Sequence, residues 1–248
     1  MSRTEPLKPQ DRLVALVPAA GVGARALKGH EAPVPKQYRL LTGQAMLRRT
    51  VQALLVDMRI DQVRVAVAPE DDQAVEVLEG LARVVCVPCG GETRAQTVYN
   101  ALCDAQLARD DWALVHDAAR PGLPADALGR LIDACLPNGV GGLLALPVAD
   151  TVKRARTVAP APSGIAAVET TLARDRLWLA QTPQMFRAGL LREALERVLV
   201  HATNTDNMPT DEAQAMEAAG YAPLLVPGSG RNTKITWPDD FEWVESWL

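Results

Sequence analysis

A glycine-containing loop with nearby cations lies close to the start of the chain. The stretch VPAAGVGARALKGHEAPVPKQY, residues 17–38, places Gly21 and Gly23 just after a short apolar run, and Arg25 and Lys36 follow them. Glycines let the backbone come close to a bound group, and exposed N–H groups can cradle phosphate oxygens. Arg25 and Lys36 could bind the same anion through their charges. The alternative is a tight turn with solvated cations.

Two common nucleotide-binding patterns do not fit this loop. GVGARA matches G-x-G-x-x-[GA] with Ala26 in the last place, but a dinucleotide-binding fold needs an acidic residue about 20 positions further, at the end of a second strand. Glu31 comes too early for this role, and Asp57 comes too late, at the end of a predicted helix. A Walker loop needs Gly-Lys-Ser/Thr, which the stretch lacks. The loop therefore predicts phosphate binding of another kind.

A second group of polar residues follows another apolar run. LVHDAARP, residues 114–121, places His116, Asp117 and Arg120 at and just past the end of a predicted buried strand. Ligands of open α/β sheets bind beyond the carboxyl ends of strands, and the carboxylate of Asp117 could hold a ribose hydroxyl or a magnesium ion. The alternative is a capped turn before a helix. His116 precedes the loop, where a packed, hydrogen-bonded histidine is expected rather than a base or ligand.

Three further stretches contain residue types that bind ligands. GGETRAQTV, 90–98, has glycines that leave room for a flat base, and Arg94 could hydrogen-bond that base or pack on the loop. NTKIT, 232–236, places Lys234 in a predicted strand, where a lone lysine is ordinarily an exposed edge residue. CVPC, 86–89, is a C-x-x-C, but it ends a strand-like run and has no second ligand pair nearby. Small buried hydrophobic side chains are therefore expected there instead of redox or metal chemistry.

Apolar patterning predicts the elements that position these residues. Short apolar runs predict buried strands at 12–19, 62–69, 83–88, 112–117 and 141–149, and helical spacing alternates with them at 43–58, 69–81, 92–107 and 124–136. Thr42 and Pro124 are the predicted helix-start residues. This alternation predicts an α/β fold of the Rossmann-like kind, with a mostly parallel twisted sheet and helices on both faces.

The alternation ends at Asp150. Two β-like pieces flank a tip of Pro, Ala, Gly and Ser residues at 159–164, which predicts a protruding β-hairpin arm over about 150–180. An exposed hairpin needs its edges covered, and pairing with a second subunit would cover them. Predicted helices follow near 187–199 and 211–219, with strands at 222–226 and 232–236 and a C-terminal helix that has Pro238 in its first turn.

The composition is that of an ordinary globular protein. The 248 residues are 48% apolar and 23% charged, with a net charge of −4, so there is no overall basic field to hold nucleic acid. No apolar run reaches the roughly 18 residues that span a membrane. Residues 1–12 are polar and are expected to form a flexible tail without a signal-peptide core. A single domain over 13–248 and a cytoplasmic location are expected.

Several motifs together resemble those of a known family. In chain order they are PAAGVGAR, PKQY, GGETRAQTV, VHDAARP, DTVKR, QTPQMF, TDEA and NTKIT. From about Leu13 to the C-terminus the chain is similar to the 2-C-methyl-D-erythritol 4-phosphate cytidylyltransferases of non-mevalonate isoprenoid biosynthesis. The resemblance implies a nucleotidyltransferase fold and transfer of CMP from CTP to 2-C-methyl-D-erythritol 4-phosphate, with release of pyrophosphate. It also implies a divalent cation such as Mg²⁺ and a homodimer formed through the arm.

The resemblance implies a role for each matching position. The nucleotide would be bound by Ala19, Ala20, Gly21, Gly23, Gly91, Arg94 and Thr97. Catalysis would depend on Arg25, Lys36 and Lys234 at the phosphates, and on Asp117 near the ribose, the reacting phosphate and the metal. The acceptor would be bound by Arg120, Thr151, Arg174, Thr182 and Thr210, with Thr151 and Arg174 supplied by a neighbour's arm. The chain departs from the family pattern in the ten residues between Arg25 and Lys36, a longer loop than usual, and in Ala26, where Met is common.

The implied reaction fits the residue types in the chain. A phosphate oxygen is already ionised near neutral pH, so the attack needs no general base, and the sequence offers no convincing Ser-His-Asp or Cys-His arrangement. Two alternatives stay open: a cytidylyltransferase for another polyol phosphate such as ribitol 5-phosphate, and a nucleotide-binding protein without catalysis. An NAD(P)-dependent oxidoreductase is disfavoured by the missing acidic residue.

Overall fold

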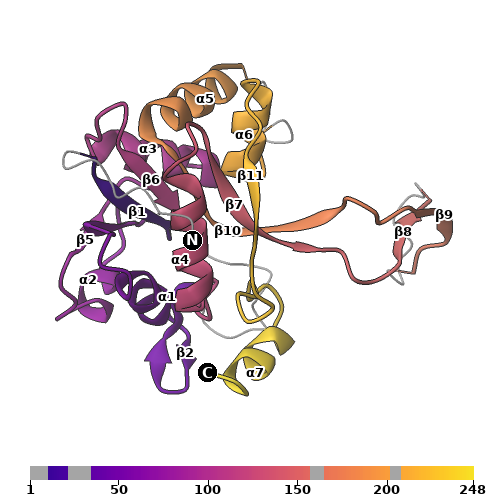
Figure 1. The fold of residues 1–248 in the computed structure, drawn as a ribbon. Helices are drawn as coiled ribbons and strands as arrows, with labels where there is room; N and C mark the ends of the chain where they lie inside the picture. The colour runs from indigo at the N-terminus through magenta and orange to yellow at the C-terminus, as the bar shows by residue number, and fades with distance from the viewer. Residues whose placement is uncertain (1–10, 22–34, 157–164, 202–207) are drawn as a thin grey trace.

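A seven-stranded sheet forms the centre of the computed structural model (Figure 1). The structure describes residues 11–21, 35–156, 165–201 and 208–248. The order of strands is β11-β7-β10-β6-β1-β4-β5. β10 pairs antiparallel with β6 and β7, and the other pairs in this sheet are parallel. In chain order the strands are β1 (Leu13–Pro18), β4 (Gln62–Ala66), β5 (Val84–Val87), β6 (Trp112–Val115), β7 (Gly141–Pro147), β10 (Trp178–Arg187) and β11 (Leu224–Pro227).

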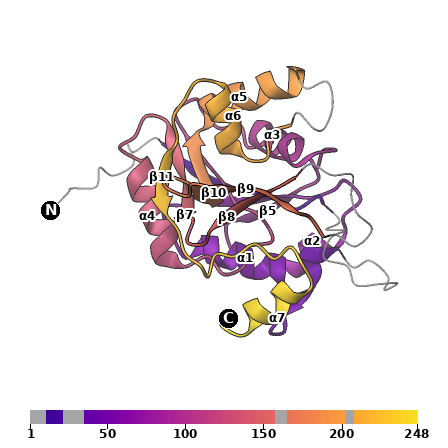
Figure 2. The same ribbon diagram turned by 90° about the vertical axis from the view of Figure 1, so that its right-hand side faces the viewer.

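Helices cover both faces of the sheet, as the alternating pattern predicts (Figure 2). One face carries α1 (Met46–Leu55), α2 (Gln73–Val77) and α4 (Ala125–Cys135), and the other carries α3 (Arg94–Asp104), α5 (Ala188–His201) and α6 (Glu212–Ala218). Alternate residues of β1 pack into the two layers: Leu13 lies in the first, and Val14 lies in the second. Because β1 is buried on both faces, its sequence is continuously apolar.

A smaller core joins the C-terminal helix to the body. Phe241 and Val244 of α7 (Asp239–Glu245) pack with Leu41, Met46 and Ile235. The guanidinium of Arg39 lies 3.9 Å from the centre of the Phe241 ring. This core places residues 232–236 beside α1 and the loop that follows β6.

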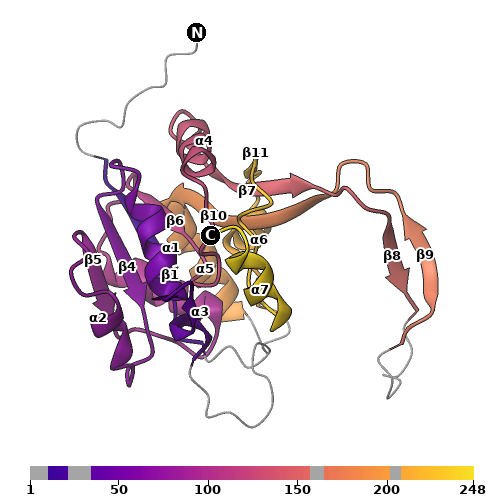
Figure 3. The ribbon, with the colours of Figure 1, turned by 90° about the horizontal axis from the view of Figure 1, so that it is seen from below.

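The predicted arm protrudes from the body (Figures 1 and 3). β8 (Val152–Ala155) and β9 (Val168–Leu172) pair antiparallel, and in the part of the chain that the structure describes they pair with no other strand. Ile165, Val168 and Leu179 are 78%, 55% and 58% exposed. The predicted tip at 159–164 lies outside the described residues. The returning segment of the arm continues into the sheet as β10.

The helix predicted over 43–58 begins later than expected, so the prediction of Thr42 as its start is wrong. Thr42 and Gly43 have φ values of 44° and 81° and form the turn between the short strands β2 (Leu40–Leu41) and β3 (Gln44–Ala45). Arg49 of α1 donates to the carbonyl oxygens of Leu41 and Thr42 at 2.7 and 3.1 Å. The other predicted start is confirmed, because Pro124 is the N-cap of α4.

Two further predicted elements differ from the structure. In place of a helix over 69–81, α2 covers only Gln73–Val77: the Asp71 carboxylate accepts the N–H groups of Gln73 and Ala74, and Gly80 at φ 78° follows its end. Residues 232–236 form no strand. The Ile235 N–H donates to the carbonyl oxygen of Ala119 at 2.9 Å, so this segment binds the loop after β6 instead of a sheet edge.

The start of the described chain is tied to the body. The Arg12 N–H donates to Asp111 at 2.8 Å, and Asp11 lies 3.2 Å from Arg187. Residues 1–10 of the predicted tail lie outside the described residues. Among the helices that the structure describes, none has the length and apolar character needed to cross a membrane.

Candidate active site

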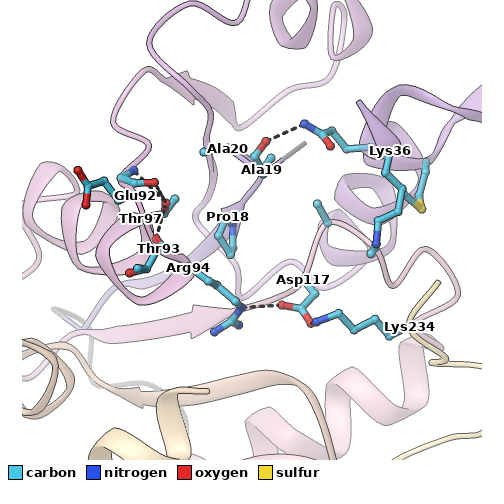
Figure 4. Close-up of a pocket in the computed structure, with 16 residues that line it drawn as sticks. Pro18, Ala19, Ala20, Lys36, Glu92, Thr93, Arg94, Thr97, Asp117 and Lys234 are labelled. Atoms are coloured by element: carbon cyan, nitrogen blue, oxygen red, sulfur yellow. Dashed lines mark hydrogen bonds and ion pairs between the residues drawn. The ribbon is translucent and has the colours of Figure 1, made fainter. Parts of the chain in front are cut away.

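A cavity of about 290 Å³ lies at the carboxyl ends of β1 and β6 (Figure 4). It is bounded by the residues after β1, the turn that contains Lys36, the start of α3, the loop after β6 and the segment that contains Lys234. Nine of the predicted site residues line it: Ala19, Ala20, Gly21, Lys36, Gly91, Arg94, Thr97, Asp117 and Lys234. The position of the cavity is the one expected for the ligand site of an open α/β sheet.

The loop after β1 packs tightly against the neighbouring strand end. The Ala19 N–H donates to the Ala66 carbonyl at 2.7 Å, and the Gln37 side chain donates to the Ala19 carbonyl at 2.8 Å. A Cβ at Gly90 would lie only 2.5 Å from Cβ of Ala20 and 2.8 Å from the carbonyl oxygen of Val67. Only glycine therefore fits between the ends of β1 and β4. Gly23 and Arg25 lie outside the described residues.

The start of α3 forms one wall of the cavity. Thr93 caps the helix by accepting the Gln96 N–H at 3.1 Å. The Thr97 hydroxyl accepts the Gly91 N–H at 3.0 Å and donates to the Thr93 carbonyl at 3.0 Å. These bonds hold the Gly90–Gly91 turn against the helix, so that the residues predicted to bind cytidine lie together on one wall.

Asp117 lies among three cationic side chains. Its Oδ1 accepts from Nε of Arg94 at 2.9 Å, and its Oδ2 lies 2.8 Å from Nζ of Lys234 (Figure 4). Nε of Arg120 is 3.7 Å from the same Oδ2. Burial by itself would raise the pKa of Asp117, but the charges of Arg94, Lys234 and Arg120 outweigh it and hold the pKa well below its usual range. Asp117 therefore stays ionised throughout the physiological range of pH.

Glu212 is a member of this cluster that the sequence patterns do not reveal. It is 1% exposed, and its two carboxylate oxygens accept from the two Nη atoms of Arg94 at 2.7 and 3.1 Å. Burial lowers the pKa of Arg94, but Glu212 and Asp117 together raise it above its ordinary value, so Arg94 stays charged. The only signal in the sequence is the TDEA motif, which the resemblance identifies without a role for the glutamate.

Lys36 and Lys234 come from opposite ends of the chain and line the same cavity. Nζ of Lys36 donates to the carbonyl oxygen of Ile235 at 2.7 Å, next to Lys234 in sequence. Lys234 was expected at a strand edge, but its segment is irregular and is held by Asn232, whose side chain donates to the Thr182 carbonyl at 2.7 Å. Two lysines that the sequence separates by almost the whole chain therefore meet at one site.

The residues predicted to bind the acceptor lie outside the described lining of the cavity. Arg120 and Thr182 are buried behind it: Nη1 of Arg120 donates to the Asn232 carbonyl at 2.6 Å, and Oγ1 of Thr182 accepts the Asp117 N–H at 3.0 Å. Thr151 and Arg174 are exposed just before β8 and just after β9 of the arm, and Arg174 donates to the Ala149 carbonyl. Thr210 is exposed before α6 and contacts Gln214. Their predicted roles stay predictions.

His116 is buried and hydrogen-bonded, as the sequence predicts. Its Nδ1 lies 3.0 Å from Oγ1 of Thr182, and its Nε2 lies 3.2 Å from the Arg120 carbonyl. A neutral ring with its proton on Nε2 satisfies both contacts, because Nδ1 then accepts the threonine hydroxyl. Burial lowers the pKa of His116 from 6.5 to about 4. His116 therefore supports the loop of Asp117 and is not a base at neutral pH.

We expect acid to destabilise the protein through His116. Between pH 6.5 and about 4, His116 is protonated in the unfolded chain but stays neutral in the folded protein. The free energy of unfolding that is present above this range is therefore lost as the pH falls through it. The loss amounts to about 3 kcal/mol. Urea unfolding at about pH 7 and about pH 4 should give a smaller difference for His116→Gln than for the wild type. Equal differences would contradict the assignment.

Cys86 and Cys89 do not form a reactive pair in this structure. Both thiols are free and half-buried, and burial raises the pKa of each, which disfavours the thiolate. In the part of the chain that the structure describes, no group of three or more His, Cys, Asp or Glu side chains is arranged to hold a metal ion. The expectation of small buried side chains is met only in part, because Cys86 and Cys89 are both half-buried.

Comparison with known proteins identifies the family. The family described as 2-C-methyl-D-erythritol 4-phosphate cytidylyltransferase matches residues 13–248. A protein of that name from Bordetella petrii is 63% identical over 238 residues, which cover 96% of this chain and 99% of the relative. A crystal structure of a 4-diphosphocytidyl-2C-methyl-D-erythritol synthase has a TM-score of 0.79 at 37% identity, covering 96% of this chain and 99% of the other. That of the Francisella tularensis cytidylyltransferase has a TM-score of 0.77 at 34% identity, with coverages of 96% and 100%. The chain therefore belongs to the 2-C-methyl-D-erythritol 4-phosphate cytidylyltransferase family.

Proposed function

We propose that the protein transfers CMP from CTP to 2-C-methyl-D-erythritol 4-phosphate, in the non-mevalonate route to isoprenoid precursors. The observation that carries this proposal is the convergence of Lys36, Lys234 and Arg94 around one cavity with the ionised Asp117. Such a site has positive charge for a polyanion and a carboxylate for a metal or a ribose. Membership of the family supplies the identity of the two substrates.

The reaction joins two anions, and this determines what the residues must do. An oxygen of the acceptor phosphate forms a bond to the α-phosphorus of CTP, the bond from that phosphorus to the bridging oxygen breaks, and pyrophosphate leaves with the electron pair. No proton has to be removed from the nucleophile. The difficulty is the charge that collects on the leaving pyrophosphate. Lys36 and Lys234, as compact cations, stabilise this charge where it develops, and Arg25 is proposed to assist them.

The nucleotide is proposed to lie between the loop after β1 and the start of α3. Ala19, Ala20, Gly21 and Gly23 would follow the phosphates and the edge of cytosine. Gly91, Arg94 and Thr97 would bind the cytidine, with Gly91 held in place by the Thr97 hydroxyl. The small side chains after β1 leave space for close approach of a ligand to the backbone.

The residues present fit a magnesium ion held jointly by the protein and CTP. Asp117 is a buried carboxylate on the cavity wall, and Mg²⁺ is ordinarily bound by one or two carboxylates together with substrate phosphates and water. Asp117 would therefore hold the ion, and the phosphates of CTP would supply further ligands. When bound, the ion would offset negative charge on the triphosphate. The Asp117 carboxylate also pairs with Arg94 and Lys234, which line the same cavity.

The acceptor site is proposed to be completed by a second copy of the chain. Thr151 and Arg174 flank the β8–β9 hairpin of the arm, do not line the described cavity of their own subunit, and would enter the site of the neighbour. The exposed apolar side chains of the arm support this arrangement, because a second subunit would cover them. Arg120, Thr182 and Thr210 would contribute from the body, Thr182 through the loop of Asp117. A cytoplasmic location stays a prediction.

Arg174→Ala is expected to weaken binding of the acceptor phosphate. Loss of one charged contact should raise the KM for 2-C-methyl-D-erythritol 4-phosphate about tenfold, with a smaller change in the KM for CTP. Steady-state kinetics with each substrate varied in turn provide the measurement. Arg176→Ala is a matched control, since Arg176 is an exposed arginine of the same segment. An unchanged KM for the acceptor in Arg174→Ala would remove this residue from the site.

The protein is expected to be a dimer at micromolar concentration. Sedimentation equilibrium measures this directly. Deletion of residues 153–171, with a short linker in their place, should leave a folded monomer with strongly reduced turnover, because the arm would no longer reach a neighbouring site. A wild-type protein that sediments as a monomer but turns over normally would contradict the role of the arm.

The function itself is tested by pyrophosphate release. The protein is incubated with Mg²⁺, each of the four NTPs in turn and 2-C-methyl-D-erythritol 4-phosphate, and release is expected with CTP. Release only when ribitol 5-phosphate replaces this acceptor would show that the reaction is cytidylyl transfer but that the acceptor is a different polyol phosphate. Binding of CTP without release for either acceptor would leave a nucleotide-binding protein without catalysis.

A further inference from the structure

Glu212 lies next to the candidate active site without lining its cavity. It is the first residue of α6, it is buried, and both of its carboxylate oxygens bond to Arg94. Arg94 does line the cavity, and its Nε bonds to Asp117. Within the described contacts Glu212 therefore reaches the site through Arg94.

The position of Glu212 is held by the sheet. Gln184 of β10 donates to the Asp211 carboxylate at 2.9 Å and accepts the Ala213 N–H at 2.8 Å, so it binds α6 on both sides of Glu212. Gln184 is also the register partner of Val115 in β6, two residues before Asp117. One strand pair thus positions both carboxylates relative to Arg94.

The hydrogen bonds that Arg94 donates to Glu212 determine which partner each carboxylate oxygen of Asp117 contacts. Because both Nη atoms face Glu212, Arg94 gives Asp117 a single hydrogen bond, from Nε to Oδ1. Oδ2 then has Lys234 as its near partner at 2.8 Å, with Nε of Arg120 farther away at 3.7 Å. Without Glu212, the guanidinium of Arg94 could rotate and donate two hydrogen bonds to Asp117, one to each carboxylate oxygen. Such bidentate pairing is the favoured geometry of an arginine–carboxylate pair.

We propose that Glu212 is a positioning residue: by holding the two Nη atoms of Arg94 it reserves Oδ2 of Asp117 for Lys234 and so keeps Lys234 at the cavity. The importance of Glu212 for turnover rests on the proposed nucleotidyl transfer. The effect of Glu212 on the position of Lys234 is independent of that proposal and can be measured without substrate.

Competitive acetylation measures the access of reagents to Lys234. The chain has only five lysines, Lys8, Lys28, Lys36, Lys153 and Lys234, so the labelling of each can be followed by mass spectrometry of its peptide. In Glu212→Gln, Arg94 can take both oxygens of Asp117, and Lys234 is released. We expect the labelling rate of Lys234, relative to the exposed Lys153, to rise at least about threefold. Glu217→Gln is the control, since Glu217 is an exposed residue of the same helix.

Two replacements separate positioning by charge from simple packing. Glu212→Asp keeps the charge on a shorter side chain, whereas Glu212→Gln keeps the shape and loses the charge. Positioning by charge predicts that labelling of Lys234 increases from wild type to Asp to Gln. It also predicts that kcat falls in the same order, by about tenfold or more in Glu212→Gln, while the KM for CTP changes less than about threefold. A packing role predicts the reverse order of the two variants. All rates are measured well below the unfolding midpoint of each variant.

The outcomes distinguish this inference from the proposed function. Increased labelling in the order given supports the positioning role. Unchanged labelling of Lys234 in Glu212→Gln, or a stronger effect in Glu212→Asp, overturns it even if the wild type turns over CTP. Increased labelling in a protein that releases no pyrophosphate supports the positioning of Lys234 and overturns the proposed function instead.

Discussion

Asp117→Asn is expected to lower kcat by about three orders of magnitude. The amide has the shape of the carboxylate but no charge, and it would lie among Arg94, Arg120 and Lys234. The NH₂ group of the amide would face the N–H groups of a neighbouring cation, and both are hydrogen-bond donors. At least one hydrogen bond of Asp117 is therefore replaced by a repulsive contact. The proposed metal would also lose its protein ligand.

The same change is expected to destabilise the fold. Removal of one partner from a buried ion-pair cluster leaves cations without compensation, at a cost of about 3 kcal/mol or more in the free energy of unfolding. Urea unfolding checks this value, and pyrophosphate release gives kcat for the folded protein. Asp126→Asn is the control, because Asp126 is an exposed residue of α4 paired with Arg130. A kcat within about tenfold of the wild type would exclude Asp117 from the reaction.

Lys234→Ala is expected to reduce kcat about a hundredfold with little loss of stability. Its side chain is 40% exposed and lines the cavity, so its removal costs little in the free energy of unfolding. In the reaction it is proposed to stabilise charge on the leaving pyrophosphate, from its place at the cavity wall beside Asp117. Lys234→Arg should recover only part of the activity, because the planar guanidinium cannot reproduce a compact ammonium in contact with Asp117.

Arg231→Ala provides the matched control for this prediction. Arg231 is an exposed cation three residues earlier in the same segment, so its removal changes the net charge equally. Activity is compared at low and high salt to separate a general electrostatic effect from a local one. Equal losses in the two variants would indicate that only the overall field matters and would contradict a specific role for Lys234.

Much of the sheet could be predicted because its pattern is local. β1 and β6 are continuously apolar runs that end in Gly- and Asp-containing loops, and this arrangement follows from burial on both faces of a parallel sheet. The failures are local as well. The turn at Thr42 and Gly43 is bound by hydrogen bonds that Arg49 donates, and the short α2 begins where the Asp71 carboxylate accepts a backbone N–H. The hydrophobic period does not indicate either contact.

By itself the sequence determined the family, the kind of fold and the loops that carry the chemistry, because apolar periodicity and local motifs are written in consecutive residues. Only the tertiary structure decided which charges meet. Glu212 lies 118 residues from Arg94, and Lys36 lies 199 residues from the carbonyl that it binds. The tertiary structure also corrects the prediction for Lys234, which lies beside Asp117 and not at a strand edge. A buried ion pair forms where packing brings two elements together. No pattern of consecutive residues indicates which distant elements will pack against each other.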